Sequence, residues 1–246
     1  MEWREEDGGR WLEAELPAGR AAFSTRLGGV SRPPYESLNL GILTGDERDA
    51  VSENRRRLAS MLGLDPERVL MGRQVHGSDL ETHDAAQRPS PYARPGSPLS
   101  DADGHHARLP GLAPLVLVAD CLPIALAGSG GVAMLHCGWR GLAAGIVARG
   151  VRAVGASAAA IGPGIGPCCY EVGDEVLGRF ADLPAAVADG RMLDLIAVAR
   201  QQLDDAGVDA VEAAGLCTSC ESELFFSHRR DGTRTGRQAG LVWIEG

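Results

Sequence analysis

The hydrophobic and polar positions of this 246-residue chain divide into short apolar runs, typical of strands, and segments with the spacing of amphipathic helices. The apolar runs predict strands at residues 20–24, 69–71, 115–127, 131–137, 158–162, 208–213 and 239–245. The helical spacing predicts helices at residues 44–63, 139–154, 174–181 and 192–206. The longest linker is a Pro-rich segment at 87–100, so we expect residues 1–246 to form a single α/β domain.

The helix at 44–63 is the clearest of these elements. Thr44 or Asp46 can cap its N-terminus, and Gly63 can end it. Its run of three arginines, Arg55 to Arg57, is expected to face solvent. The Pro-rich segment is expected either to be disordered or to cover a site as a lid.

The two apolar runs in the middle of the chain flank Gly128-Ser129, and a two-residue Gly-X loop is typical of a β-hairpin. With these residues as the loop, Cys121 lies directly opposite His136, with Cβ atoms about 4.5–5.5 Å apart. The pair suits two ligands of one metal, or a thiol that shares a proton with an imidazole. Pro123 cannot donate to the ladder, so the register can shift, and buried Cys and His are also common as packed core residues.

Other candidate ligands lie outside this hairpin. His76 ends an extended segment beside a glycine and can project into a cleft, although taken alone it is an ordinary histidine. His83 lies among acidic residues and is expected at the surface. The run Asp101-x-Asp103-x-His105-His106 contains metal-binding residue types, but it matches no specific ligand spacing and precedes a strand rather than lying on one.

Four cysteines follow in the second half of the chain. Cys168 and Cys169 are adjacent, a spacing more often structural than chelating. Cys217 and Cys220 form a CxxC without a second pair at zinc-finger spacing, which leaves a redox or metal-binding role open.

Several residues are candidates for binding an anionic or sugar-containing substrate. His136 ends its apolar run just before a predicted helix N-terminus, a favourable place for an anion, and Arg140 follows in the first turn. An ion pair between Arg140 and one of the 33 acidic residues is the alternative. Arg26 lies beside a Gly-Gly turn, and Asn39 can bond a substrate or close an Asx turn. Further arginines near the C-terminal end are Arg230, Arg234 and Arg237.

Composition restricts the function classes. The chain carries a formal charge of -9, which argues against nucleic acids and acidic membrane surfaces as partners and favours small substrates. All 24 basic residues are arginine, which excludes a phosphate-loop lysine and a Schiff-base lysine. No apolar run reaches the roughly 18 residues of a membrane helix. The acidic first residues do not resemble a secretory signal, so we expect a cytoplasmic protein whose six cysteines are thiols or ligands.

Seven sequence blocks occur in order along nearly the whole chain and together resemble one known family. The resemblance is to the YfiH family, also called the polyphenol oxidase or laccase-domain family and regarded as a family of purine nucleoside phosphorylases. The blocks are TRLGGVS at 25–31, SLNLG at 37–41, QVHG at 74–77, ADCLP at 119–123, HCGWRG at 136–141, GPGIGPCCYEVG at 162–173 and TGRQAG at 235–240.

This resemblance implies a metal site formed by His76, Cys121 and His136, with zinc in the phosphorylase view and copper in the oxidase view. It implies a mixed α/β sandwich of αββα layers, an α+β fold related in topology to a cysteine hydrolase. The implied substrates are phosphate and the purine nucleosides adenosine, inosine and S-methyl-5′-thioadenosine, with deamination of adenosine as a second activity. We expect phosphate or ribose contacts from Arg26, Asn39 and Arg140, in a monomer or homodimer.

Two other functions compete with this one. A copper-dependent polyphenol oxidase is one, although six histidines cannot supply the roughly ten imidazoles of a multicopper site. A hydrolase or deamidase with Cys121 as nucleophile and His136 as base is the other. Cys137 is expected to point away from the metal, and His105-His106, which depart from the family pattern, leave open an extra metal contact.

Overall fold

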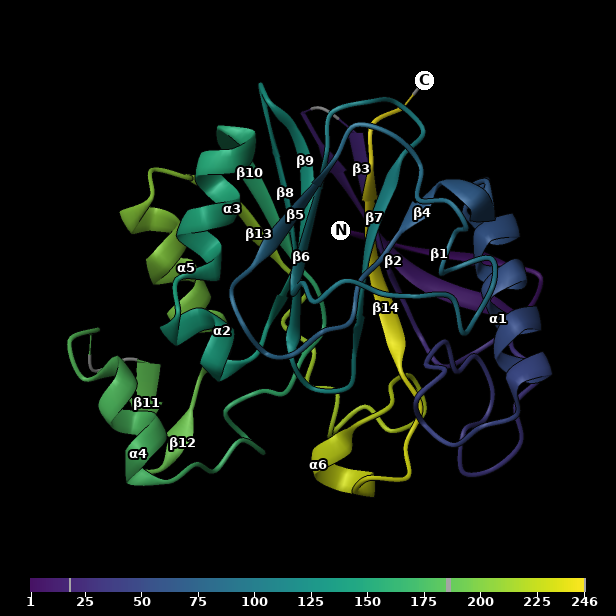
Figure 1. Ribbon diagram of the computed structural model, residues 1–246. Helices are drawn as coiled ribbons and strands as arrows, with labels where there is room; N and C mark the ends of the chain where they lie inside the picture. Colours follow the sequence, from purple (N-terminus) through teal and green to yellow (C-terminus); the bar gives the residue numbers. More distant parts are fainter. Residues whose placement is uncertain (18, 185–186, 246) are drawn as a thin grey trace.

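Two six-stranded β-sheets lie face to face at the centre of the fold (Figure 1). The computed structural model describes residues 1–17, 19–184 and 187–245. Side chains such as Phe23 and Val116 of the first sheet and Met134 of the second form the core between the sheets. Burial of these apolar groups is the main force that holds the two sheets together.

The first sheet has the strand order β1-β2-β3-β14-β7-β4. Its strands are β1 (Glu2–Glu6), β2 (Gly9–Leu16), β3 (Gly19–Ser24), β14 (Gln238–Trp243), β7 (Ala113–Val118) and β4 (Val69–Leu70). All neighbours are antiparallel except β4 and β7. The C-terminal strand β14 therefore lies in the middle of the sheet, between β3 and β7. The hairpin β1-β2 was not predicted; its turn residues Asp7 and Gly8 both have positive φ, as a tight Asp-Gly hairpin turn requires.

The second sheet has the order β13-β10-β8-β9-β6-β5. Its strands are β13 (Ala210–Ala213), β10 (Ala156–Ile161), β8 (Leu122–Gly128), β9 (Gly131–Cys137), β6 (Gly104–Ala107) and β5 (Leu80–His83). The pairs β10-β13 and β5-β6 are parallel, and the others are antiparallel. The sequence predicted neither β5 nor β6, so the expectation that His105 and His106 precede a strand is wrong: both lie on β6.

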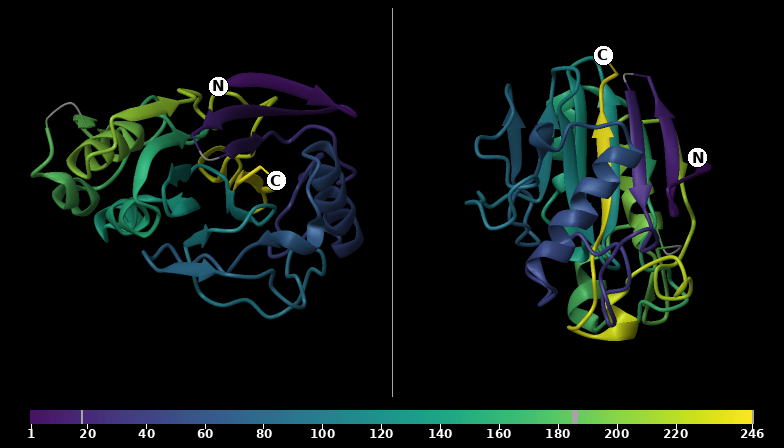
Figure 2. Two further views of the ribbon diagram at one scale, coloured as in Figure 1. Left: turned by 90° about the horizontal axis from the view of Figure 1, so that it is seen from above. Right: turned by 90° about the vertical axis from the view of Figure 1, so that its right-hand side faces the viewer.

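Helices cover the outer faces of both sheets, which gives the αββα layers implied by the family resemblance (Figure 2). Helix α1 (Arg48–Met61) packs on the first sheet, and α3 (Ile146–Val154) and α5 (Leu195–Asp205) pack on the second. The shorter elements are α2 (Trp139–Ala143), α4 (Asp174–Leu177), α6 (His228–Asp231), η1 (Pro66–Arg68), η2 (Gly178–Phe180), β11 (Ala188–Asp189) and β12 (Met192–Leu193). None of the helices in the described ranges has the length and apolarity that crossing a bilayer requires.

Several predicted helices differ from those observed. The helix expected at 174–181 is α4 followed by the 3-10 helix η2. The single helix expected at 139–154 is divided into α2 and α3, because Gly145 has a φ of 80° and interrupts the helical path. The helix expected at 192–206 begins only at Leu195, since residues 192–193 pair with β11 and Asp194 caps the helix with its side chain.

The central hairpin is present, but its predicted register is wrong. The loop is Ser129-Gly130, so Pro123 rather than Cys121 lies opposite His136. Moving the loop by one residue shifts every partner by two positions, which leaves each side chain on the same face of the sheet. Cys121, just before β8, therefore remains diagonal to His136. Cys137 points to the opposite face, as predicted, and is buried under the helices of the second sheet.

Helix α1 also corrects two expectations. It begins at Arg48, and neither Thr44 nor Asp46 caps it; both instead accept hydrogen bonds from the side-chain amide of Asn39. Arg55 does not face solvent but is only 2% exposed. Its guanidinium donates to the carbonyl oxygens of Leu40, Pro91 and Tyr92.

The Pro-rich segment at 87–100 is an irregular connection that packs against α1. Tyr92 is buried there, and its hydroxyl donates to the carbonyl oxygen of Arg55. The segment's Leu99 lines a cavity of about 550 Å³. The segment thus contributes a wall to this cavity, and Arg55 anchors it.

Replacing Arg55 by Met should lower the free energy of unfolding by about 2–4 kcal/mol, because three buried carbonyl oxygens lose charge-assisted donors. Denaturant unfolding measures this change. Arg56→Ala is the matched control, because the side chain of Arg56 is 64% exposed and forms an ion pair with Glu53. Its effect on the free energy of unfolding should stay within about 0.5 kcal/mol. Equal effects of the two substitutions would contradict a structural role for Arg55.

Candidate active site

Two imidazoles and one thiol converge where three distant segments of the chain meet. The ligand atoms of His76, Cys121 and His136 all lie within 4.8 Å of one another. The two imidazole rings stand edge to face with centroids 4.9 Å apart. His136 comes from the end of β9, Cys121 from the turn before β8, and His76 from the loop between β4 and β5. The structure thus brings together all three predicted metal ligands.

A buried carboxylate, Asp103, holds this arrangement in place. It is 0% exposed and accepts a hydrogen bond of 2.7 Å from His136 Nδ1. It also accepts the backbone N–H groups of Val75, His76 and Gly77 at 3.1, 3.0 and 2.7 Å. These bonds keep His76 in a left-handed conformation with a φ of 59°. A carboxylate behind a ligating histidine fixes the ring so that its other nitrogen faces the ligand site.

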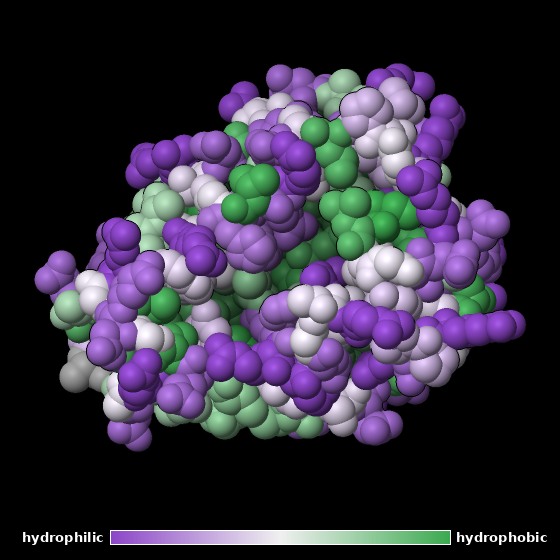
Figure 3. Space-filling model, turned by 60° about the horizontal axis from the view of Figure 1, so that its bottom comes forward, coloured by the Kyte–Doolittle hydropathy of each residue, from purple (hydrophilic) through white to green (hydrophobic). Residues whose placement is uncertain are grey.

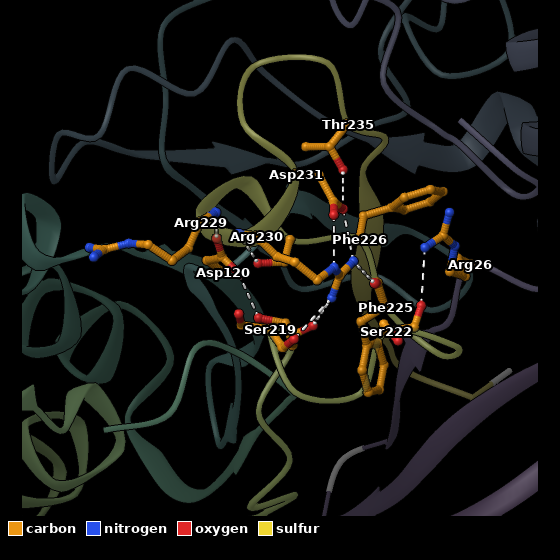
Figure 4. A network of polar contacts seen from close by, with 12 residues as sticks. Arg26, Asp120, Ser219, Ser222, Phe225, Phe226, Arg229, Arg230, Asp231 and Thr235 are labelled. Carbon is orange, nitrogen blue, oxygen red and sulfur yellow. Dashed lines mark hydrogen bonds and ion pairs between the residues drawn. The ribbon is translucent and has the colours of Figure 1, made fainter. Parts of the chain in front are cut away.

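A second carboxylate, that of Asp120, fixes the turn that carries Cys121. Asp120 has a φ of 96° in the turn between β7 and β8. Its carboxylate accepts hydrogen bonds of 2.7 Å from the hydroxyl of Thr218 and from the backbone N–H of Arg229 (Figure 4). The turn that presents the thiol is therefore held by loops from the C-terminal part of the chain.

The electrostatics favour an ionised thiol beside a protonated imidazole in the metal-free protein. Burial opposes ionisation of Cys121, but the charge and hydrogen bonds of His136 and His76 outweigh it and lower the pKa of the thiol to about 6. Burial likewise disfavours protonated His136, yet Cys121 and Asp103 raise the pKa of the imidazole to about 9. For Asp103, burial is outweighed by His136 and the backbone N–H groups, so its pKa is lowered and it stays charged.

The cluster lies in a cavity of about 550 Å³, a volume typical of small-molecule sites. With the lower end of Figure 1 turned forward, the surface is hollowed near its centre, and hydrophobic side chains lie in the hollow and on its rim (Figure 3). Apolar lining residues are Ile42, Leu43, Leu99, Leu117, Trp139 and Ile165. Among them, Leu43 is 83% exposed.

Five of the arginines that the structure describes line the same cavity. Arg55 bonds buried carbonyl oxygens and Arg73 pairs with Asp101. The other three are Arg140, Arg229 and Arg237. Arg140 stacks its guanidinium over the ring of Trp139 at 4.4 Å, and it makes no ion pair with any residue in the described ranges. The ion pair with an acidic residue, which was the alternative for Arg140, is therefore not formed within the described ranges. The predicted helix N-terminus contributes little, because α2 has only five residues and a correspondingly small dipole.

Among the described residues, neither Arg26 nor Asn39 belongs to the lining of the cavity. The guanidinium of Arg26 donates to the carbonyl oxygens of Glu36 and Ser222 and stacks over Phe226. Asn39 is fully buried and accepts the backbone N–H of Arg237 at 2.9 Å. Their substrate contacts remain predictions; the observed bonds position the loops that carry Thr44 and Arg237.

The other histidines are arranged differently from the expectations. His83 is buried, not exposed, and its Nε2 lies 3.0 Å from Nδ1 of His105. Burial lowers the pKa of both side chains, so both are neutral at neutral pH. His106 bonds Thr82 and the carbonyl oxygen of Gly130. Among the described residues, neither His105 nor His106 joins the group of His76, Cys121 and His136. His105 lies instead in a separate group with Glu81 and His83, whose ligand atoms are within 4.8 Å of one another.

Some functional residues were not recognised from the sequence. Asp103 was noted only as part of a doubtful metal-binding run, although its role is to support two ligands. Tyr170, His228 and Arg229 also line the cavity. Tyr170 belongs to one of the family-like blocks, which was the only signal for it; His228 and Arg229 lay in a segment whose role the sequence did not define.

The donor set matches a catalytic zinc site in its chemistry. Three protein ligands that face an accessible cavity, with a carboxylate behind one histidine, leave one coordination position for substrate or water. The same geometry also resembles a nucleophilic thiol with an imidazole base oriented by a carboxylate. The fold and the site are therefore those expected of an enzyme that uses either a bound metal or an activated thiol.

The chain belongs to the family described as multi-copper polyphenol oxidoreductase laccase, whose model matches residues 20–245. It is 41% identical over 243 residues to the purine nucleoside phosphorylase YfiH of Shigella flexneri, a match that covers 93% of this chain and 96% of the relative. It is 43% identical over 237 residues to a purine nucleoside phosphorylase of Streptomyces coelicolor, covering 91% of this chain and 94% of that protein. The solved structure of the hypothetical protein YfiH of Bacillus licheniformis superimposes with a TM-score of 0.90 at 33% identity, covering 99% of both chains. The resemblance and the mixed α/β fold are thus confirmed.

In metal-depleted protein, alkylation of Cys121 by iodoacetamide should reach half its maximal rate near pH 6. The thiol is protonated and unreactive below this pH and a reactive thiolate above it, whereas an ordinary thiol titrates near about 8.5. Mass spectrometry of the Cys121 peptide measures the rate. Buried Cys137, whose pKa is raised, is the internal control and should stay unmodified.

His136→Ala should move the midpoint for Cys121 above about 8.5, because burial then acts without the neighbouring cation. If wild-type Cys121 titrated like an ordinary thiol, the thiolate–imidazolium pair would be refuted.

Proposed function

We propose that this protein is a metal-dependent purine nucleoside phosphorylase that acts on adenosine, inosine and S-methyl-5′-thioadenosine, with adenosine deaminase activity in addition. The observation that carries the proposal is the group His76, Cys121 and His136 in a cavity whose lining also includes Arg140, Arg229 and Arg237. Relatives whose matches cover more than nine-tenths of this chain are named purine nucleoside phosphorylases, which supports the same reaction.

Phosphorolysis breaks the bond between the sugar C1′ and the purine nitrogen and forms a bond from C1′ to a phosphate oxygen. The purine leaves with the bonding electrons and takes up a proton. Arg140, Arg229 and Arg237 would hold the phosphate dianion, because guanidinium groups bind phosphate oxygens in pairs. Trp139 and Tyr170 would pack against the nucleoside, and Arg26 and Asn39 would act on the substrate-binding loops.

The ligand group fits Zn²⁺ best, with Cu²⁺ as the alternative. A thiolate and two imidazoles in a pocket with one open side are typical ligands of catalytic zinc. A metal held by His76, Cys121 and His136 would supply Lewis acidity in the cavity. Asp103 keeps Nδ1 of His136 engaged, so Nε2 remains the nitrogen available for coordination. A multicopper oxidase would need more imidazoles than the six histidines provide.

A cysteine hydrolase or deamidase is the second candidate, and one observation favours it. Cys121, His136 and Asp103 form a chain of thiol, imidazole and carboxylate, the arrangement of a nucleophile, its base and an orienting group. The edge-to-face position of His76 favours the metal site instead, because a third ligand atom lies beside the thiol. We also propose that residues 1–246 act as a single domain with a topology related to cysteine hydrolases.

Incubation of zinc-loaded protein with inosine should release hypoxanthine and ribose 1-phosphate only when phosphate is present. Liquid chromatography with mass spectrometry identifies the products, and the reaction without phosphate is the control. His136→Ala should abolish the activity together with metal binding at the cavity site. Undiminished phosphorolysis by the metal-depleted variant would refute the proposal, and a metal-independent activity lost on alkylation of Cys121 would favour the hydrolase.

Asp103→Asn should weaken zinc binding about 10- to 100-fold, because the neutral amide supports the ligating form of His136 less well. Competition with a chromophoric chelator measures the affinity. Asp101→Asn is the matched control, since this carboxylate is 47% exposed and pairs with Arg73, away from the ligands; its affinity should equal that of the wild type. Unchanged affinity in Asp103→Asn would contradict the assigned role.

A further inference from the structure

Four cysteines form a second cluster outside the cavity site. The sulfur atoms of Cys168, Cys169, Cys217 and Cys220 all lie within 4.8 Å of one another. Cys220 Sγ lies 3.5 Å from both Cys168 Sγ and Cys169 Sγ. The adjacent cysteines and the CxxC, which appeared unrelated in the sequence, thus supply two ligand pairs to one point.

Backbone pairing between two loops brings these residues together. Gly164 and Cys217 form an isolated parallel bridge, in which Thr218 N–H donates to the carbonyl oxygen of Gly164 at 2.9 Å. The N–H of Gly166 donates to Cys217 Sγ at 3.2 Å. A Cβ atom on Gly166 would lie 3.3 Å from Cys168 Sγ and 3.2 Å from Cys217 Cβ, closer than most Cβ contacts. Glycine at this position therefore allows the two cysteine pairs to approach each other.

We propose that these four cysteines bind one structural zinc ion as a Cys₄ site. Four Zn–S bonds of about 2.3 Å in a regular tetrahedron place the sulfur atoms about 3.8 Å apart, close to the observed separations of 3.5 Å. Binding forms four Zn–S bonds and releases four thiol protons to solvent, leaving a net charge of about −2 on the site. All four positions are taken by protein ligands, which is typical of structural rather than catalytic zinc.

A positive group lies next to the proposed site. The guanidinium of Arg230 donates to the carbonyl oxygens of Thr218 and Ser219, the two residues between the CxxC cysteines (Figure 4). The same guanidinium forms an ion pair with Asp231 at 2.8 Å, so its main effect is to order the CxxC turn through the two carbonyl oxygens. The N–H bond from Gly166 to Cys217 Sγ favours a thiolate, as do N–H donors around metal-bound sulfur in general.

The arrangement favours an ion over disulfides. Cys220 Sγ is equally close to Cys168 Sγ and Cys169 Sγ, so the geometry does not single out one disulfide partner. A single ion satisfies all four sulfur atoms at once. Cys168 and Cys220 are exposed, so an ion can enter from solvent.

The proposed zinc would lie outside the cavity and stabilise two loops that contribute to it. Thr218, inside the CxxC, bonds the carboxylate of Asp120, which precedes Cys121. Tyr170, which follows Cys169, lines the cavity. A Cys₄ zinc would thus tie together the two loops that hold the ligand turn and one cavity wall.

The test measures metal in a Cys121→Ser background, which removes the thiolate of the cavity site. Purified Cys121→Ser protein should retain about one zinc per chain, measured by inductively coupled plasma mass spectrometry. Adding Cys217→Ser and Cys220→Ser should remove this zinc. Ser219→Ala, in the same turn, is the matched control and should retain it. An equal zinc content with and without the CxxC cysteines would overturn the proposal.

A second measurement does not require the variant that lacks Cys217 and Cys220 to fold. Replacement of zinc by Co²⁺ in the Cys121→Ser protein should give the strong visible bands and sulfur-to-metal charge transfer of tetrahedral cobalt thiolate, and Ser219→Ala should give the same spectrum. Absence of these bands would overturn the proposal. So would a disulfide between Cys220 and either Cys168 or Cys169 in the protein as purified, detected by mass spectrometry without reduction. Neither result bears on phosphorolysis, so the two proposals fail separately.

Discussion

One buried carboxylate sets the geometry on which the site depends. Asp103 comes from the segment that leads into β6, yet it bonds three consecutive backbone N–H groups of the loop at 75–77 and the ring of His136. Removing a charge from water is unfavourable unless donors replace the water, and here four N–H groups do so. The same four bonds join two segments that are about sixty residues apart. The position of His76 and the orientation of His136 are therefore not independent, because a single group determines both.

Loops from the C-terminal part of the chain fix the third ligand, Cys121. Asp120 holds the cysteine turn only because Thr218 and the backbone of Arg229 reach it, and Arg230 braces the same loop through carbonyl oxygens and Asp231. These loops lie outside the two sheets, where no ladder of hydrogen bonds orders them. Hydrogen bonds made by the side chains of Asp120, Thr218 and Arg230 take over that function. The rigid sandwich thus provides the framework, and polar contacts between loops provide the exact shape of the cavity.

The sequence predicted those parts of the structure that depend on local patterns. The strands at 158–162 and 239–245 were close to β10 and β14, and even the wrong hairpin register kept Cys121 and His136 on one face, since the face depends only on parity. The hairpin β1-β2 was missed although its Asp-Gly turn is a recognised signal. Strand β6 was missed because Gly-His-His-Ala has no alternation of polar and apolar residues. Arg55 was misplaced because a run of arginines was treated as one surface, whereas neighbouring residues on a helix face different directions.

The roles of Asp103 and the four distant cysteines could not follow from local patterns, because each depends on contacts between segments far apart in the chain. The position of β14 has a comparable consequence for synthesis on the ribosome. Strands β3 and β7 are made early, but both must leave an edge unpaired until β14 emerges and inserts between them. Arg237, just before β14, arrives with it. The nascent chain therefore cannot assemble its first sheet, or close the pocket, until translation has passed residue 243.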